Sequence, residues 1–100
     1  MKARMSKWCA WIAETDPVKL AQTYREWLKK AGFNILSEVS YHFYPQGFTQ
    51  LYLLAESHFA IHTFPEEHKT YVELSSCNEK MYDRFLAYQN SGTQEFKALG

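Results

Sequence analysis

The chain has 100 residues, and its 11 Lys plus Arg balance its 11 Asp plus Glu. This length predicts one domain over residues 1–100. A composition that is 46% hydrophobic and 17% aromatic supplies enough apolar surface for a core, which argues against intrinsic disorder. A net charge of zero creates no field that would concentrate nucleic acid or anionic lipid, so we expect neither nucleic acid nor a membrane as a partner.

The apolar segments are too short for a transmembrane helix or a secretory signal. The longest, such as residues 51–55, fall far short of the ~20 residues that span a bilayer. The apolar segment at residues 8–13 runs into acidic residues, unlike a signal peptide. Two cysteines, Cys9 and Cys77, are too few for a disulfide framework. We therefore expect a cytoplasmic protein in which both cysteines are thiols.

The first third of the chain is predicted to form a strand and then a helix. Residues 8–14 are aromatic and apolar, as in a strand, and stop at Thr15 and Asp16, where a polar cap precedes Pro17 at the first helical position. From residue 18 onward, apolar side chains recur at spacings of three and four, which is typical of one helix face. Gly32 supplies the C-terminal stop.

Period-two alternation then predicts a series of strands. In residues 33–43 it places Phe33, Ile35, Val39, Tyr41 and Phe43 on one side and Asn34, Glu38, Ser40 and His42 on the other. A turn at 45–47 is followed by β-rich runs at 48–55, 59–64 and 70–76, separated by polar residues 56–58 and a charged loop at 65–69. Residues 78–88 have helical spacing, and a last edge strand is expected around Phe96 in the weakly patterned C-terminal segment.

This order of elements predicts an α+β fold. We expect a two-layer sandwich, with a largely antiparallel sheet and both helices packed on one face. Aromatic side chains spread along several strands would then be left on the other face. They require a cover, either a dimer partner or a ligand.

Polar residues that interrupt the apolar strands are the candidates for chemistry, although each also has a structural explanation. They are Thr49, Glu56, Ser57, His58, His62, Glu66 and Cys77. A zinc site is disfavoured because His58 and His62, if they share a strand, would be about 13 Å apart. The sequence also lacks the Gly-x-Ser-x-Gly elbow of serine hydrolases, a Gly-rich phosphate loop and an RNA-binding basic-aromatic run.

The spacing of these residues carries a family resemblance. Residues 54–66 read LAESHFAIHTFPE; His62 follows Ser57 by five residues, and Cys77 follows Ser57 by twenty. Upstream, FYPQGFT at residues 43–49 matches a Phe-x-Pro-x-Gly segment with a later hydroxyl residue. Residues 33–77 thereby resemble the prokaryotic type of S-adenosylmethionine decarboxylase, a family that makes its own pyruvoyl cofactor.

The resemblance implies a sandwich that pairs into a homodimer and a chain that cuts itself between Glu56 and Ser57. Ser57 would attack the carbonyl of Glu56, and elimination would leave a pyruvoyl group derived from Ser57. Thr49 matches the hydroxyl residue that assists processing, in place of the usual serine. His62 matches the histidine that assists proton removal.

The resemblance also implies a reaction and a substrate site. The pyruvoyl ketone would form a Schiff base with the amine of S-adenosylmethionine and accept electrons as carbon dioxide leaves, a step in spermidine synthesis. Cys77 matches the proton donor. Phe43 matches the aromatic that stacks on adenine, and Glu66 matches the carboxylate that binds the ribose hydroxyls. No metal is implied.

Two alternatives stay open on the sequence alone. Phe64 stands where the family usually has Trp, and Ala60 where it has Ser or Thr, so the substrate could instead be a basic amino acid such as arginine or ornithine. The other alternative is an unprocessed, non-catalytic homologue that binds a ligand or regulates a partner. Alternation puts residues five apart on opposite strand faces, so contact between Ser57 and His62 requires the hairpin turn to bring them together.

Overall fold

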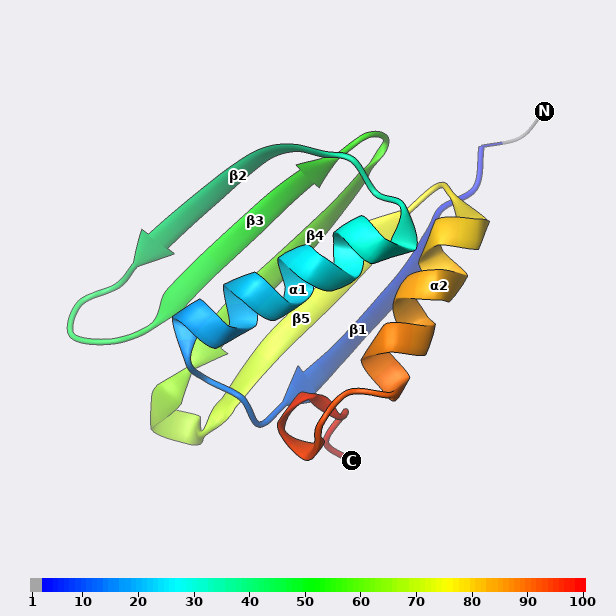
Figure 1. Ribbon diagram of the computed structural model, residues 1–100. Helices are drawn as coiled ribbons and strands as arrows, with labels where there is room; N and C mark the ends of the chain where they lie inside the picture. The colour runs from blue at the N-terminus through cyan, green and yellow to red at the C-terminus, as the bar shows by residue number, and fades with distance from the viewer. Residues whose placement is uncertain (1–2) are drawn as a thin grey trace.

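The computed structural model describes residues 3–100 as one five-stranded sheet with two helices on one face (Figure 1). The elements are β1 (Ser6–Ile12), α1 (Pro17–Ala31), β2 (Ile35–His42), β3 (Phe48–Leu54), β4 (Ser57–Phe64), β5 (Lys69–Ser76) and α2 (Glu79–Asn90), with 3₁₀ turns at Pro65–Glu67 and Gln94–Phe96. The strand order is β1-β5-β4-β3-β2, and each neighbouring pair is antiparallel. The predicted α+β two-layer sandwich is confirmed.

The ends of both helices are set by local side-chain chemistry. The Asp16 side chain accepts a hydrogen bond from the Lys19 amide at 2.8 Å, and Pro17 starts α1. Gly32 ends this helix with φ 106°, a left-handed conformation that favours glycine. Asn78 caps α2 in the same way, accepting from the Met81 amide at 3.0 Å. Within residues 3–100, neither helix has the length and apolar character that a membrane crossing requires.

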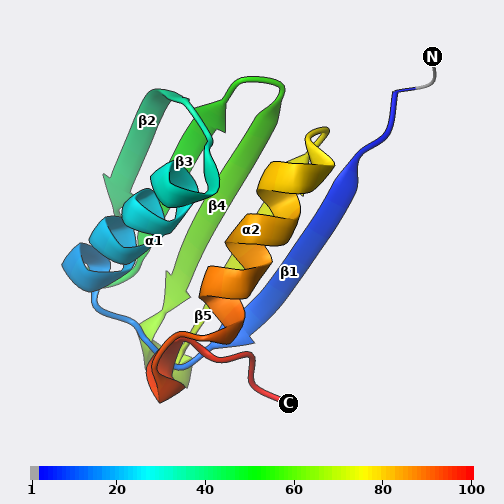
Figure 2. The ribbon, with the colours of Figure 1, turned by 45° about the vertical axis from the view of Figure 1, so that its right-hand side comes forward.

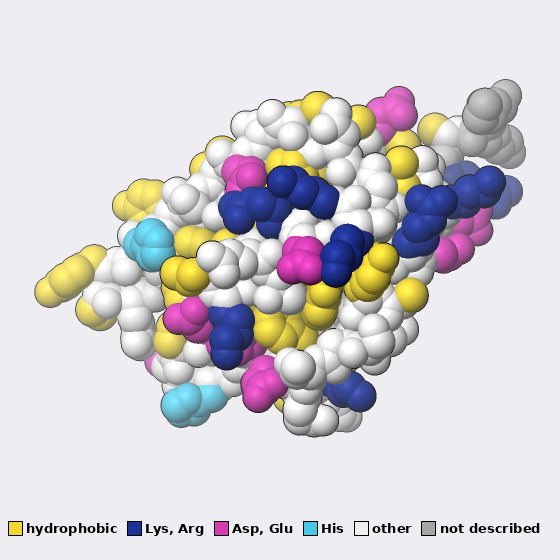
Figure 3. Space-filling view, in the orientation of Figure 1, with side chains coloured by type: hydrophobic (Ala, Val, Ile, Leu, Met, Phe, Trp, Pro, Cys, Tyr) yellow, Lys and Arg dark blue, Asp and Glu magenta, His cyan; other side chains and the backbone are white. Residues whose placement is uncertain are grey.

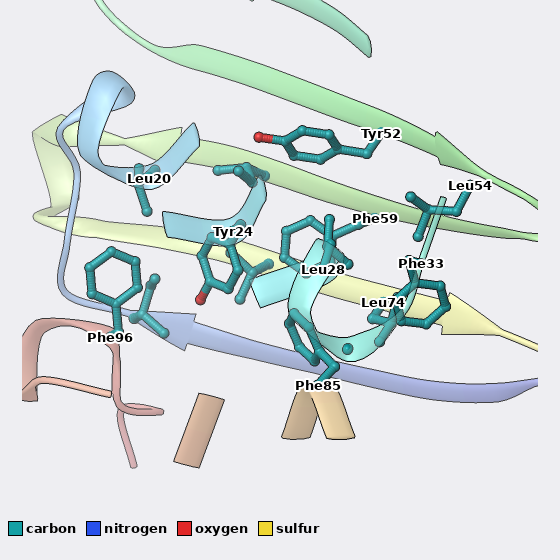
Figure 4. Close-up of a cluster of buried hydrophobic side chains, with 14 residues drawn as sticks. Leu20, Tyr24, Leu28, Phe33, Tyr52, Leu54, Phe59, Leu74, Phe85 and Phe96 are labelled. Atoms are coloured by element: carbon teal, nitrogen blue, oxygen red, sulfur yellow. The ribbon is translucent and has the colours of Figure 1, made fainter. Parts of the chain in front are cut away.

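The core lies between the helices and the sheet, where aromatic rings from both layers meet (Figure 4). Tyr24 of α1 lies 4.7 Å from Phe59 of β4 between ring centroids, and Phe85 of α2 lies 5.4 Å from Phe59. The Tyr24 hydroxyl donates to Gln89 at 2.8 Å, and burial raises its pKa well above the ordinary value. Gln89 in turn donates to the Phe96 carbonyl, so one buried amide ties α1 to the C-terminal segment.

The expected edge strand around Phe96 is wrong. Residues Gln94–Phe96 form a 3₁₀ turn, and the edges of the sheet are β1 and β2. The Phe96 ring is buried 5.6 Å from Tyr24 and 5.4 Å from Trp27, measured between centroids. Because this side chain fills the end of the core, its segment curls at the C-terminal end of α2 (Figure 2) instead of extending along a strand.

The alternation expected in β2 is also wrong at Ile35, which lies on the opposite face of the sheet from Val39 and Tyr41. A register shift between Ile35 and Ser37 inserts one residue, so Ile35 pairs with Leu54 on the helix side while Val39 and Tyr41 lie on the opposite face. Glu38 consequently points toward α1, where Arg25 binds it bidentately with a shortest N–O distance of 2.6 Å.

The face opposite the helices, here called the open face, is apolar. Val39, Tyr41, Leu51 and Leu53 of β2 and β3 lie there with 59%, 61%, 43% and 54% of their surface exposed. An aromatic cluster over β1, β4 and β5 continues the patch: Trp11, Phe64 and Tyr71. The helix side instead carries charged side chains of both signs (Figure 3). An apolar face of this kind marks an interaction surface.

Candidate active site

The first group of predicted site residues lies at the turn between β3 and β4. Leu54 pairs with Ser57, so the turn consists of residues 55 and 56, and Ser57 is the first residue of β4. Glu56 has φ 57°, in the left-handed region. A residue with a Cβ adopts this conformation at a cost on the order of 1 kcal/mol. Backbone strain therefore lies beside the Glu56–Ser57 peptide bond.

Ser57 belongs to a compact cluster at this end of the sheet. Its buried hydroxyl donates to Ser76 Oγ at 2.9 Å, because the two residues are register partners in β4 and β5. The exposed thiol of Cys77 lies 3.7 Å from Glu56 Oε2. We call Glu56, Ser57, Ser76 and Cys77 the turn cluster. The structure thus brings the predicted cleavage site and proton donor together.

The second group surrounds a cavity of about 330 Å³ near the other end of β4. Thr49 Oγ1 and His62 Nδ1 are 3.0 Å apart on paired positions of β3 and β4. Phe43 and Glu66 also line the cavity, and Glu66 Oε2 accepts a hydrogen bond from Gln46 at 3.4 Å. We call Phe43, Thr49, His62 and Glu66 the pocket cluster.

Gly47 holds the turn that carries Phe43 into this cavity. The Phe43 amide donates to the Gly47 carbonyl at 2.8 Å, and Gly47 has φ 112°. A side chain would be strained in this conformation even though there is room for a Cβ. The glycine therefore permits the backbone reversal that places the Phe43 ring at the pocket.

The predicted contact between Ser57 and His62 is wrong within one chain. Both residues belong to β4, and five residues of extended strand separate them by about 16 Å. Ser57 faces the helices with Phe59 and Ile61, whereas His62 faces the open side with Thr49. The turn cannot bring them together because it ends at Glu56, before either residue.

Comparison with known proteins places the chain in a family. The family model for S-adenosylmethionine decarboxylase matches residues 10–95. The chain belongs to this family. It is similar to the S-adenosylmethionine decarboxylase proenzyme of Prochlorococcus marinus (strain MIT 9313), with 40% identity over 65 residues, 65% of this chain and 52% of the relative. The corresponding proenzyme of Persephonella marina is 38% identical over 71 residues, 67% of this chain and 53% of the relative.

The fold agrees with a solved member of the S-adenosylmethionine decarboxylase family. The crystal structure of the adenosylmethionine decarboxylase from Aquifex aeolicus matches with a TM-score of 0.71 and 26% identity, over 88% of this chain and 78% of that one. The chain spans about half the length of the curated relatives that it matches. These matches confirm the predicted prokaryotic-type family.

Residues 3–100 contain no group of three His, Cys, Asp or Glu side chains that could hold a metal ion. His58 and His62 both lie in β4, so extended strand separates them. His58 Nε2 lies 4.0 Å from Glu73 Oε2 in the neighbouring strand β5.

Ser76, which binds Ser57 in the turn cluster, is not among the residues that the sequence pattern or the family resemblance predicted. A signal for it was present in the loop predicted at residues 65–69. An antiparallel hairpin centred on residue 67 would pair residue 57 with residue 77, and the structure pairs Ser57 with Ser76. The loop position therefore locates the partner of Ser57 to within one residue.

Proposed function

We propose that this chain is a pyruvoyl-dependent decarboxylase of S-adenosylmethionine that cuts itself between Glu56 and Ser57. The observation that supports it most is the left-handed Glu56 directly before a buried, hydrogen-bonded Ser57. Backbone strain at Glu56 next to an oriented hydroxyl favours an acyl shift at the bond between them. The relatives are named proenzymes, which agrees with a chain that matures by cleavage.

The proposed self-cleavage uses only side chains of this protein, from one copy or its partner, and one water. Ser57 Oγ attacks the Glu56 carbonyl carbon; a C–O bond forms, the C–N bond breaks, and the hydroxyl proton ends on the Ser57 nitrogen. Removal of the Ser57 Cα proton then breaks the Cβ–Oγ bond and releases Glu56 as a carboxylate. The resulting enamine tautomerises, takes up one water and loses ammonia, which leaves a pyruvoyl group at residue 57. Thr49 and His62 are proposed to assist, with His62 accepting the proton.

The residues around position 57 fit a pyruvoyl group. Ser57 starts β4, so cleavage would leave the group at the end of a paired strand. The pyruvoyl group supplies a ketone that accepts electrons during decarboxylation of an amino acid. Cys77 follows β5 and is exposed beside this turn, and its thiol can return a proton to the substrate α-carbon.

The pocket cluster fits the nucleoside end of S-adenosylmethionine. Its cavity of about 330 Å³ lies at the lower end of the range for small-molecule sites. Phe43 offers a half-exposed ring for stacking on adenine and attraction of the sulfonium charge. The Glu66 carboxylate can accept hydrogen bonds from both ribose hydroxyls.

A homodimer explains why one chain divides its site between two clusters. Two copies can cover their apolar open faces by packing face to face. If the two-fold axis lies between the two sheets and perpendicular to the strands, the strands of the two copies run in opposite directions. The Ser57 end of β4 in one copy then lies over the His62 end of β4 in its partner. Each proposed active site then combines the turn cluster of one copy with the pocket cluster of the other.

The cellular setting follows from the same proposal. Decarboxylated S-adenosylmethionine is used in spermidine synthesis, as the family resemblance implies. Cys9 and Cys77 are both free and exposed, which suits a reducing compartment such as the cytoplasm.

The deciding experiment is the mass of the denatured protein, with Ser57→Ala as the matched control. We expect two fragments, residues 1–56 and a pyruvoyl-blocked 57–100, from the native chain and one full-length mass from the variant. Release of carbon dioxide from S-adenosylmethionine, arginine and ornithine then identifies the substrate, and we expect S-adenosylmethionine alone. A native chain that stays intact on long incubation would overturn the proposal and favour the non-catalytic alternative.

A further inference from the structure

Ser76 is a buried hydroxyl residue in the turn cluster with no role in the chemistry proposed so far. It ends β5, has none of its surface exposed, and pairs with Ser57 of β4 on one side and Ser6 of β1 on the other. We propose that Ser76 is a positioning residue for self-cleavage. Its hydroxyl accepts a hydrogen bond from Ser57 Oγ and so holds the Ser57 side chain in place to attack the Glu56 carbonyl carbon. This inference rests on the self-cleavage proposed above.

The hydrogen bonds of Ser76 set the direction of the contact with Ser57. Ser76 Oγ accepts from the Asn78 amide at 3.0 Å and donates its own proton toward the Asn78 carbonyl at 3.4 Å. A hydroxyl has one proton and two acceptor sites, so the remaining site accepts the proton of Ser57 Oγ at 2.9 Å. The lone pairs of Ser57 Oγ are then free to face a carbonyl carbon.

Burial makes this orientation important. Ser57 has 5% of its surface exposed, so bulk water is poorly placed to hold its hydroxyl. Without Ser76, the Ser57 side chain would lose this partner and rotate among its rotamers. A misplacement of the attacking atom by about 1 Å can slow a reaction about 100-fold.

Ser76 also joins the bond to be cut to the proposed proton donor. Its hydroxyl binds both backbone groups of Asn78 and so closes the chain around Cys77. Cys77 Sγ in turn lies 3.7 Å from Glu56 Oε2. One hydroxyl therefore fixes the nucleophile and the neighbouring thiol loop at the same time.

The test compares Ser76→Thr with Ser76→Val in the full chain. These side chains have nearly the same shape, and only threonine has the hydroxyl. The fraction of cut chain is followed by denatured mass after synthesis, with and without hydroxylamine, which traps the ester at Glu56. We expect Ser76→Thr to cut at nearly the native rate and Ser76→Val about 100-fold more slowly, with loss of the hydroxylamine-trapped fragment.

Two further variants separate positioning from folding. Ser76→Ala covers the case in which neither larger side chain fits. It loses the hydrogen bonds to Asn78, so its melting temperature should fall, and it is expected to cut slowly at a temperature well below its own melting transition. Ser75→Ala, the neighbour in β5, is expected to cut at the native rate. Equal rates for Ser76→Val and Ser76→Thr when both variants are folded, or a native rate for Ser76→Ala, would overturn the role of Ser76 alone. A native chain that never cuts would overturn the proposed function, and this inference with it.

Discussion

Ser57 and His62 lie in the same strand, about 16 Å apart and on opposite faces of the sheet. Ser57 binds Ser76 in the turn cluster, whereas His62 binds Thr49 in the pocket cluster. Two residues proposed for one cleavage reaction are thus separated within each chain. A second copy with reversed strands is the arrangement that would bring them together.

The first prediction is that inactive chains complement each other. Ser57→Ala removes the cleavable residue, and His62→Ala removes the proposed base, so each variant alone should stay intact. In an equal mixture of co-expressed chains, about half of the His62→Ala chains pair with a Ser57→Ala partner. That partner supplies an intact His62, so we expect up to about half of the His62→Ala chains to be cut.

Denatured mass measures this result, with a size tag to distinguish the two chains. Co-expression of His62→Ala with a Thr49→Ala chain is the matched control. This pair should cut less, because the partner's His62 lacks its hydrogen-bonded hydroxyl. An intact mixture would contradict a site shared between copies, and efficient cutting of His62→Ala alone would remove His62 from the reaction.

Local chemistry explains which parts of the fold could be predicted. Asp16, Pro17 and Gly32 define the ends of α1 through bonds and backbone preferences within a few residues, and the structure begins and ends the helix there. The Phe96 segment depends on a distant hydrogen bond from Gln89 and on stacking against Tyr24, neither of which leaves a local pattern. Tertiary packing therefore determines the conformation of the Phe96 segment, which the local sequence pattern could not predict.

The candidate site also has a part that the sequence predicts and a part that depends on the tertiary structure. Spacing along the sequence identified the members of both clusters except Ser76, but it could not assign them to the two ends of one sheet. That assignment depends on strand register, and a one-residue change in register moves a side chain to the other face. The bulge after Ile35 shows the effect, since it sends Val39 and Tyr41 to the open face.

The second prediction concerns the open face. Leu51 lies in β3 with 43% of its surface exposed, so Leu51→Arg would place a charge in the proposed interface without disturbing the core. We expect the native chain to sediment as a dimer and Leu51→Arg as a folded monomer. Cutting at residue 57 should fall with the dimer, because the pocket cluster would come from the partner.

Val18→Arg is the matched control for this substitution. Val18 is 63% exposed in the first turn of α1, on the helix side, so the variant should remain dimeric and cut normally. Sedimentation velocity measures the assembly, and denatured mass measures the cutting. A native monomer that cuts itself completely would contradict the shared site.

The third prediction concerns the pH dependence of stability. The hydrogen bonds from Arg25 hold the pKa of Glu38 below its ordinary value of 4.5. A carboxyl whose pKa is lower in the folded state stabilises the fold above its unfolded pKa, and this contribution is lost as the pH falls through the folded value. The pair is about one-third exposed, so the contribution is below about 1 kcal/mol.

In a Ser57→Ala background, which keeps the chain uncut, we expect Glu38→Gln to lower the melting temperature at neutral pH and to flatten its decline below pH 4.5. Glu26→Gln, which breaks the exposed pair with Lys30 on the same helix, is the control and should leave most of that decline in place. Melting curves measured from neutral to acid pH that run parallel for Glu38→Gln and the background would show that the pair with Arg25 does not stabilise the fold.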